Sequence, residues 1–268
     1  MKTQITSEQI AEYQRNGFLT VTDFLSSGEI EELKTAVAGA VDRMGSKKVS
    51  GGEVDWEDGD TYYSRVFTQK LNLWRIDETV KRYMLSPELG RMVSSLAGVK
   101  GMRVWHDQAL IKPPWGNPTG WHLDNPYWSF HSKNSISIWI ALEDATLNNG
   151  CLYFMPGTHK QAGFDNAPIG ENIGDLFKVY PEWAKLEAVP APLKAGSASF
   201  HNGLTAHGAG ANMTPRTRMA MTCAYMPEGS TFNGQQNPIL PDRIFKSLKV
   251  GDLLDDDDQY PLIYSEKS

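Results

Sequence analysis

From residue 102 onward, short strand-like runs alternate with clusters of turn-forming residues, and this pattern is the strongest constraint on the fold. The runs are "MRVWHDQALIK", "SISIWIAL", "CLYFMP", "SASFHN" and "TRMAMTCAYM". Gly-, Pro- and Asn-rich stretches such as "PPWGNPTG", "LNNG" and "GAGANMTP" separate them. Strands this short at this spacing predict a sandwich or a barrel and argue against alternating strand–helix units.

The region before residue 102 is predicted to be mainly helical. Two capping boxes, in which a Ser or Thr and a residue three positions later satisfy each other's backbone N–H groups, open two helices. The first helix ends at Gly17, and the second runs to about Met44. The capping pairs are Thr6 with Gln9 and Ser26 with Glu29, and "FLTV" (18–21) between the helices reads as a strand.

A third helix is expected over 76–97, with a break at Pro87 because proline lacks the N–H that a helix interior needs. The Gly-rich, charged stretch 45–60 predicts a loop. The acidic run 255–258 predicts a solvated tail segment. No repeat or linker divides the chain, so we expect one domain over 1–268. A mainly helical flank (1–100), a β core (101–228) and a C-terminal extension (229–268) would compose it.

Composition excludes several classes of partner. The net charge of −6, the pI near 5.5 and the absence of a Lys/Arg-rich run argue against nucleic acid and against an anionic membrane surface. No run of 18 apolar residues predicts a membrane span, and the start of the chain has no apolar signal segment. Two cysteines suit a reducing compartment, and the final "EKS" does not match a peroxisomal tripeptide. We therefore expect a cytoplasmic protein.

The stretch "TGWHLDNPYW" (119–128) contains a His-x-Asp pair, His122 and Asp124. Residues i and i+2 of a strand point to the same face, so both side chains could reach one metal ion. The same pattern also suits a solvated polar pair that caps a turn. The pair alone leaves both interpretations open.

A third ligand is suggested by the setting of His207, which small residues surround in "HNGLTAHGAGANMTPRTRMAM". Small residues allow the backbone to approach another group closely. Arg218 follows 11 residues later, across a turn, which suits a hairpin with one residue on each strand. The other histidines are predicted to be structural or exposed; they are His106, His131, His159 and His201.

These residues fall inside longer segments that resemble the phytanoyl-CoA dioxygenase family of Fe(II)- and 2-oxoglutarate-dependent oxygenases. The matching segments are "YQRNGFLTVTDFLSSGEIEEL", "WHLDN", "SISIWIALEDATLNNGCLYFMPGTHK" and "LKAGSASFHNGLTAHGAGANMTPRTRMAMTCAYM". The resemblance covers most of the chain in order. It implies a mainly β protein with flanking helices, built on a double-stranded β-helix (a jelly-roll, cupin-like barrel).

The resemblance implies that His122, Asp124 and His207 bind Fe(II). Two histidines and one carboxylate leave open metal positions, as in iron oxygenases, whereas structural zinc sites close with four protein ligands. The keto acid end of 2-oxoglutarate would chelate the iron, and the planar fork of Arg218 would bind its far carboxylate. Arg216 is the competing candidate. Strand parity does not separate the two arginines, and only the family's spacing favours Arg218.

The family also places a tryptophan, a lysine and a residue of the preceding strand near 2-oxoglutarate. The matching positions are Trp139, Lys70 and Gln108, although ordinary packing or a surface position explains each of them equally well. This chain departs from the family at Ala209, where many members carry a serine. Any hydrogen bond from that serine to the cosubstrate is absent here.

The carboxylate of Asp124 bears on the type of reaction, because halogenating relatives replace it with a small residue. The resemblance therefore implies hydroxylation or another two-electron oxidation that consumes O2 and 2-oxoglutarate and releases succinate and CO2. Ascorbate is expected to support activity. The alternative is a metal-binding cupin-like barrel that is no oxygenase, such as a sensor or an isomerase.

The substrate pocket is predicted to include four residues around the His-x-Asp pair, with 45–65 and 161–180 as candidate lids. The four are Trp121, Asn125, Tyr127 and Trp128. These side chains suggest a small, partly apolar molecule with polar groups. An acyl-CoA substrate is disfavoured, because an acidic chain without a basic cluster offers no cradle for the CoA phosphates. Nothing in the sequence indicates an oligomeric state.

Overall fold

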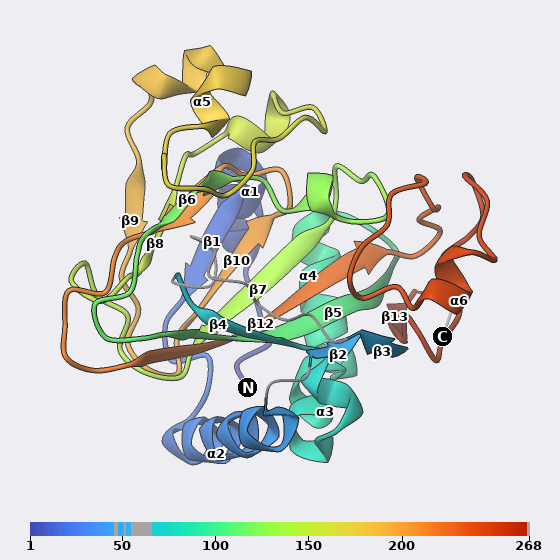
Figure 1. Cartoon of the computed structure of the whole chain (residues 1–268), viewed down its shortest axis with the longest axis horizontal. Coiled ribbons are helices and arrows are strands. Elements are labelled where there is room, and N and C mark those ends of the chain that lie inside the picture. Colours follow the sequence, from blue (N-terminus) through green and yellow to red (C-terminus); the bar gives the residue numbers. More distant parts are fainter. Residues whose placement is uncertain (46–47, 51, 55–65, 267–268) are drawn as a thin grey trace.

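Two large antiparallel β-sheets, a two-stranded hairpin and a layer of helices make up the described part of the protein (Figure 1). The computed structural model describes residues 1–45, 48–50, 52–54 and 66–266. The larger sheet has seven strands in the order β1-β10-β7-β12-β5-β13, with β4 also paired to β5. The strands are β1 (Phe18–Val21), β4 (Thr68–Leu71), β5 (Gly101–Lys112), β7 (Ile136–Ala141), β10 (Ala198–Asn202), β12 (Arg218–Pro227) and β13 (Leu262–Ser265).

The smaller sheet has four strands and packs against the larger one. Its order is β6-β11-β8-β9. One apolar cluster joins the sheets, with Trp139 and Ala220 from the larger sheet and Leu152 and Phe154 from the smaller one. The fold is the double-stranded β-helix that the resemblance implied. The smaller sheet comprises β6 (Thr119–His122), β8 (Leu152–Phe154), β9 (Val189–Ala191) and β11 (His207–Ala209).

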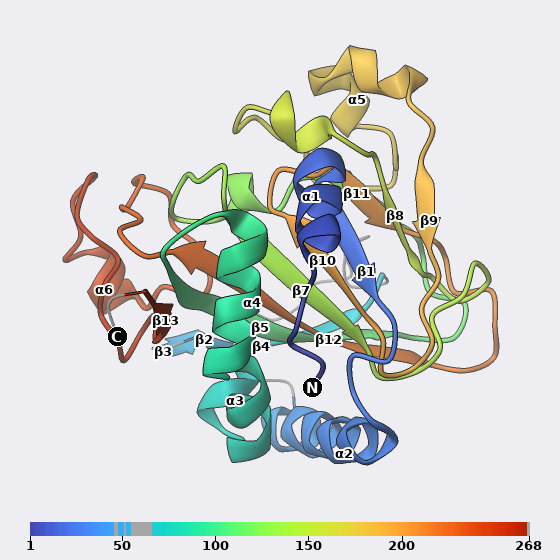
Figure 2. The same cartoon turned by 180° about the vertical axis from the view of Figure 1, so that it is seen from behind.

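Helices cover the other face of the larger sheet, as Figure 2 shows for α1 and α4. Both predicted capping boxes are present, and Gly17 ends the first helix in the left-handed conformation. The helix expected over 76–97 is two helices, and Pro87 occupies the first turn of the second, where its missing N–H costs nothing. The four helices are α1 (Ser7–Asn16), α2 (Ser27–Met44), α3 (Glu78–Met84) and α4 (Pro87–Ala97).

Short helical turns occur in the connections. The α-helical ones are α5 (Leu176–Val179) and α6 (Asp242–Phe245), and the 3-10 turns are η2 (Leu73–Arg75), η3 (Asn125–Tyr127), η4 (Thr158–Lys160) and η5 (Pro181–Lys185). Among the described residues, no helix is long and apolar enough to cross a membrane.

Strand alternation gives the larger sheet two chemically different faces. In β7, Ile138 and Ile140 join the apolar core beneath the helices, whereas Ser137 and Trp139 line an internal cavity. In β12, Cys223 belongs to the helix-side core while Thr222 faces the cavity. Because side chains alternate with a period of two, every strand of this sheet can support the core and the cavity together.

One of two predictions for the surface segments needs correction. Part of the stretch 45–60, predicted to be a loop, forms a hairpin of β2 (Lys48–Ser50) and β3 (Gly52–Val54), and its remaining residues lie mostly outside the described ones. The acidic run 255–258 is exposed, as predicted. Asp257 lies 2.5 Å from Nη1 of the buried Arg103, so it anchors the segment that leads into β13.

A buried carboxylate, Asp107, fastens the end of β4 to β5. Its two oxygens accept the backbone N–H groups of Leu73, at 2.6 Å, and Trp74, at 2.9 Å. These are the first residues of η2, whose free N–H groups need acceptors. Burial raises the pKa of Asp107 to about 7 in spite of these bonds and of the nearby Arg75. The carboxylate thereby holds the residues of β4 in place along the cavity.

We predict that Asp107→Leu destabilises the fold by about 3 kcal/mol, because two buried N–H groups lose their acceptors. Asp107→Asn keeps an acceptor oxygen and should cost less. The raised pKa means that the folded state holds a proton between pH 3.8 and about 7 that the unfolded chain releases. Stability should therefore fall as pH rises through this window, and Asp107→Asn should flatten the trend. Urea unfolding at several pH values measures both effects; wild-type stability in Asp107→Leu would contradict the assignment.

Candidate active site

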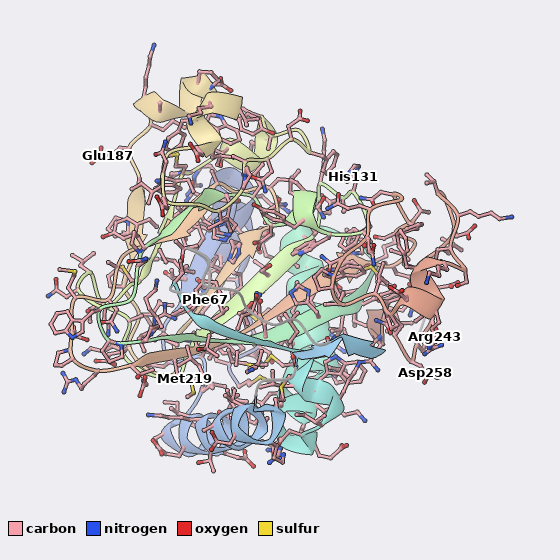
Figure 3. The ribbon with its side chains drawn as sticks, viewed as in Figure 1. Phe67, His131, Glu187, Met219, Arg243 and Asp258 are labelled. Atoms are coloured by element: carbon pink, nitrogen blue, oxygen red, sulfur yellow. The ribbon has the colours of Figure 1, made fainter. Side chains whose placement is uncertain are left out.

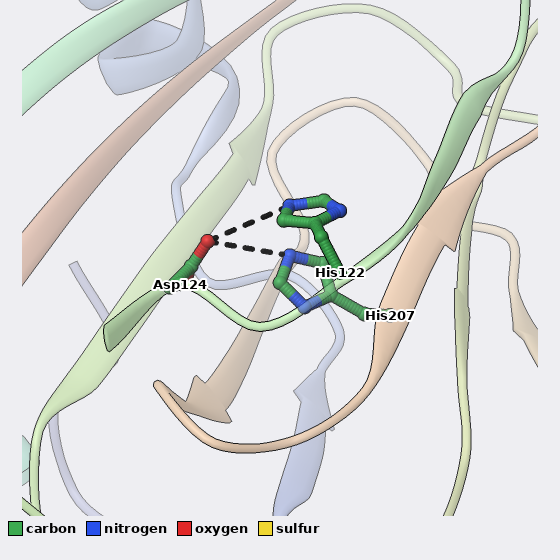
Figure 4. Close-up of side chains that lie close together, drawn as sticks. All are labelled: His122, Asp124 and His207. Carbon is green, nitrogen blue, oxygen red and sulfur yellow. Dashed lines mark ion pairs between the residues drawn. The ribbon is translucent and has the colours of Figure 1, made fainter. Parts of the chain in front are cut away.

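Three residues could hold a metal ion: His122, Asp124 and His207 (Figure 4). Each histidine Nε2 lies 3.6 Å from Oδ1 of Asp124. His122 at the end of β6 and His207 at the start of β11 are direct partners in the strand pairing, which brings residues distant in sequence side by side. The candidate ligand atoms lie within 4.8 Å of one another.

Backbone carbonyls fix the orientation of both imidazole rings. Nδ1 of His122 lies 2.9 Å from the carbonyl oxygen of Gly120, and Nδ1 of His207 lies 3.0 Å from that of Thr205. Because a carbonyl only accepts hydrogen bonds, each Nδ1 carries the hydrogen. The lone pair of each Nε2 is then left for a metal, which is how metal-binding histidines are commonly held.

The protonation states also suit a metal. Burial, and secondly the charge of His122, hold the pKa of His207 well below its usual value. Burial alone would raise the pKa of Asp124, but the surrounding histidines, His207 foremost, hold it well below its usual value. A neutral imidazole and an ionised carboxylate are the forms that coordinate metal ions.

The second carboxylate oxygen of Asp124, Oδ2, has hydrogen-bond partners of its own. Ser137 Oγ donates to Oδ2 at 3.0 Å, and Nε2 of His201 lies 3.1 Å from the same atom. Asp124 therefore presents Oδ1 to the two histidines. His201 was predicted to be structural or exposed. It is buried, lies against the metal cluster and supports Asp124, and it is not one of the three candidate metal residues. The alternation of side chains in "SASFHN" could have indicated this position. Ala198 and Phe200 join the helix-side core, so His201 faces the cavity.

Arg218 is buried, with 2% of its surface exposed, and its hydrogen-bonding capacity is largely unused. Nη2 donates to the carbonyl of Gly150 at 3.2 Å, whereas Nε and Nη1 have no partner. The guanidinium lies 5.1 Å from the Trp139 ring centre. Buried N–H groups without partners are rare, so this fork fits a carboxylate ligand. Arg216, by contrast, is exposed and precedes β12.

Lys112, which the sequence analysis missed, lies directly opposite Arg218 in the pairing of β5 with β12. Nζ donates to the carbonyls of Asn117 at 2.6 Å and Val66 at 3.3 Å. Burial, and secondly the charge of Arg218, lower the pKa of Lys112 to about 7. Among the described residues, no carboxylate forms an ion pair with either cation. A bound anion would offset their mutual repulsion.

One cavity of about 390 Å³ contains the metal cluster and Arg218. Phe67, near the middle of Figure 3, contributes to its wall. The structure thus brings eight predicted site positions together at this cavity and adds an unpredicted histidine. The predicted ones are His122, Asp124, His207, Arg218, Trp139, Gln108 and the pocket pair Tyr127 and Trp128, and the addition at the metal is His201.

Lys70 does not reach the cavity. Its neighbours Gln69 and Leu71 line the wall, and alternation directs Lys70 to the other face of β4, where Nζ donates to the carbonyl of Gly45. Gln69 takes the cavity position instead and bonds to Gln108.

Two of the predicted substrate residues also lie outside the cavity wall. Trp121 packs against Phe177 at 6.0 Å between ring centres. Asn125 is fully buried, and its side-chain oxygen accepts the N–H of Ser132 at 3.1 Å. The candidate lid 161–180 contributes Pro168 and Ile169 to the wall, whereas the lid 45–65 lies largely outside the described residues.

Comparisons with known proteins agree with this geometry. The phytanoyl-CoA dioxygenase family model matches residues 13–220. The peroxisomal phytanoyl-CoA dioxygenase of Bos taurus is 28% identical over 237 residues, covering 82% of this chain and 68% of the relative. A solved structure described as a non-heme alpha-ketoglutarate-dependent carbocyclase, SnoK from nogalamycin biosynthesis, has a TM-score of 0.77 at 26% identity, covering 97% of this chain and 96% of that one.

A second solved structure is the epimerase SnoN in complex with Fe3+, alpha-ketoglutarate and nogalamycin RO. Its TM-score is 0.76 at 25% identity, and the match covers 96% of this chain and 97% of that one. The fold, the His-Asp-His cluster and these relatives define a 2-oxoglutarate-dependent dioxygenase. The chain belongs to the phytanoyl-CoA dioxygenase family.

We predict that removing the hydrogen bonds to Oδ2 of Asp124 weakens metal binding. His201→Leu and Ser137→Ala should each lower the Fe(II) affinity about tenfold to a hundredfold, because groups that orient a metal ligand typically contribute that much. Anaerobic titration with Fe(II) against a competing chelator measures it. His201→Gln, which restores a donor, should recover part of the loss, and His159→Leu, a histidine outside the cavity, serves as control. Wild-type affinity in both variants would exclude this role.

We predict that Arg218→Ala raises the 2-oxoglutarate concentration needed for half-maximal succinate formation by about tenfold to a hundredfold. A charge-assisted pair contributes roughly 1.5–3 kcal/mol, and each 1.4 kcal/mol is a factor of ten. Arg218→Lys keeps the charge but loses the planar fork and should also be impaired. Arg216→Ala is the matched control and should change little. The opposite ranking of the two arginines would mean that the cosubstrate lies elsewhere.

Proposed function

We propose that the protein binds Fe(II) through His122, Asp124 and His207 and uses 2-oxoglutarate and O2 to oxidise a small molecule. The observation that carries the proposal is the pairing, in one cavity, of an open three-residue metal cluster with a buried arginine whose Nε and Nη1 are unpaired. Iron with chelated 2-oxoglutarate supplies the oxidising chemistry, in which O2 is consumed and succinate and CO2 are released.

The chain's own residues hold and orient the reactants. Arg218, whose guanidinium lies over the ring of Trp139, binds the far carboxylate of 2-oxoglutarate. Gly120 and Thr205 hold the histidine rings, while Ser137 and His201 hold Asp124. Phe67, Tyr127 and Trp128 contribute apolar walls that exclude water from the reacting groups.

The substrate reaction is proposed to be hydroxylation or another two-electron oxidation, because Asp124 occupies the position at which a halide site would need a small residue. The described carbocyclase and epimerase relatives show by their names that this fold also supports ring closure and epimerisation. A cytoplasmic location is supported by Cys151 and Cys223, which are both buried and free.

The alternative is a metal-binding barrel that senses or isomerises without oxidation. It requires a metal but no joint chelate of Fe(II) and 2-oxoglutarate. The two unpartnered nitrogens of Arg218 favour the oxygenase, since they provide a carboxylate site that a metal sensor does not need.

We predict that anaerobic Fe(II) and 2-oxoglutarate together produce the visible charge-transfer absorption of their chelate, and that O2 then yields succinate. His122→Ala, Asp124→Ala and His207→Ala should each abolish both signals and greatly weaken Fe(II) binding without unfolding the protein. His159→Leu should behave as wild type. Metal binding without the joint absorption would support the sensor or isomerase, and full Fe(II) affinity in all three variants would exclude this cluster.

A further inference from the structure

Four histidines line the cavity, and one of them, His106, neither belongs to the metal cluster nor bonds to Asp124. It lies on β5, is 7% exposed and forms a T-shaped contact with Trp128, with ring centres 6.3 Å apart and an interplanar angle of 81°. It lines the cavity, and neither ring nitrogen has a hydrogen-bond partner in the described part of the chain. A buried imidazole without partners is costly, which indicates that a ligand supplies one.

Several neighbouring polar groups of the wall already have partners. The Tyr127 hydroxyl donates to the carbonyl of Ala167 at 2.8 Å, and the side-chain amide of Asn237 donates to the carbonyl of Tyr127 at 2.7 Å. Gln69 and Gln108 bond to each other. His106 thus retains one donor and one acceptor for a bound molecule.

The charges in the cavity limit what that molecule can be. Histidines aside, Asp124 and Arg218 are the charged side chains among the described lining residues, and the proposed function uses both. Burial lowers the pKa of His106 to about 4, so its ring is neutral near neutral pH. An anionic substrate would find no further cation there, and a cationic one no further carboxylate.

Most of the remaining wall is apolar, and the C-terminal segment provides part of it. Three side-chain amides of this segment donate to three consecutive carbonyls after Asp124, which fixes Pro238 and Ile239 at the cavity. The segment lies beyond the family match, which ends at residue 220. The bonds run from Gln235 to Pro126 at 3.0 Å, from Asn237 to Tyr127 at 2.7 Å and from Asn233 to Trp128 at 3.1 Å.

We propose, on the basis of the proposed function, that His106 anchors the substrate and that the substrate is an uncharged, largely apolar molecule with a hydroxyl or carbonyl group. The imidazole bonds to that polar group, while Trp128, Pro238 and Ile239 contact the apolar body. An acyl-CoA does not belong to this class, because the described wall residues offer no further cation for its phosphates.

Three probes of one shape test this substrate class: 2-naphthol, 2-methylnaphthalene and 2-naphthoate. Calorimetry on the anaerobic protein with Fe(II) and 2-oxoglutarate gives the dissociation constants of all three probes. On the metal-free protein only the two uncharged probes are compared, because Arg218 is free there to bind a carboxylate. We expect 2-naphthol to bind about tenfold more tightly than 2-methylnaphthalene, which corresponds to about 1.4 kcal/mol, and 2-naphthoate to bind most weakly. Tightest binding of the naphthoate, or no preference for the naphthol, overturns the assignment of the class.

His106→Leu tests the anchor. It should remove the tenfold preference while leaving the affinity for 2-methylnaphthalene nearly unchanged, and His106→Gln should restore part of the preference. The matched control is His131→Leu, because His131 is exposed and stacks on Phe164 at 4.3 Å (labelled in Figure 3). A preference retained in His106→Leu, or lost equally in His131→Leu, overturns the role of His106.

Different measurements test the proposed function and the role of His106. The charge-transfer absorption of the Fe(II)–2-oxoglutarate chelate should be unchanged in His106→Leu. An absent chelate in the wild-type protein contradicts the proposed function, whereas the naphthol preference of the metal-free protein still decides the role of His106. A normal chelate without the preference contradicts the further inference alone.

Discussion

The burial of the Asp124 carboxylate is the constraint on which the site depends. An ionised carboxylate in a protein interior is costly unless hydrogen bonds and opposite charge stabilise it. Ser137 and His201 form hydrogen bonds with its Oδ2. Its Oδ1 lies 3.6 Å from the Nε2 atoms of both His122 and His207. A cation between these three groups would complete that stabilisation. The jelly-roll must therefore bring β6, β7, β10 and β11 to one point.

The two-faced larger sheet makes this arrangement compatible with a stable core. Its apolar face packs beneath the helices, so the residues of the opposite face are free to be polar, as Ser137, Thr222 and Arg218 are. The metal ligands lie on the smaller sheet and the adjoining loop, while Arg218 comes from the larger one. Iron and the far end of 2-oxoglutarate would consequently be held by different sheets, and the separation of the sheets sets the distance that the cosubstrate spans.

Local signals predicted much of this structure. Capping pairs and Pro87 act within one helical turn, so the helix boundaries follow from nearby residues alone. The candidate metal residues followed from spacing and resemblance, and the structure places them together. The prediction for Lys70 was wrong because the resemblance gave its position in the sequence but did not indicate on which face of β4 its side chain would lie. His201, Lys112 and His106 were missed because each is recognisable only by a neighbour that is distant in sequence.

The sequence by itself determined the fold class, the family and the candidate metal residues, because strand alternation, turn residues and the family's motifs are properties of short segments. The tertiary structure decided which side chains share the cavity. It buried Arg218 and exposed Arg216, although both have the same strand parity, because β12 begins only at Arg218. It also left His106 without a partner beside Trp128, since burial and hydrogen bonding depend on strands that meet only after folding.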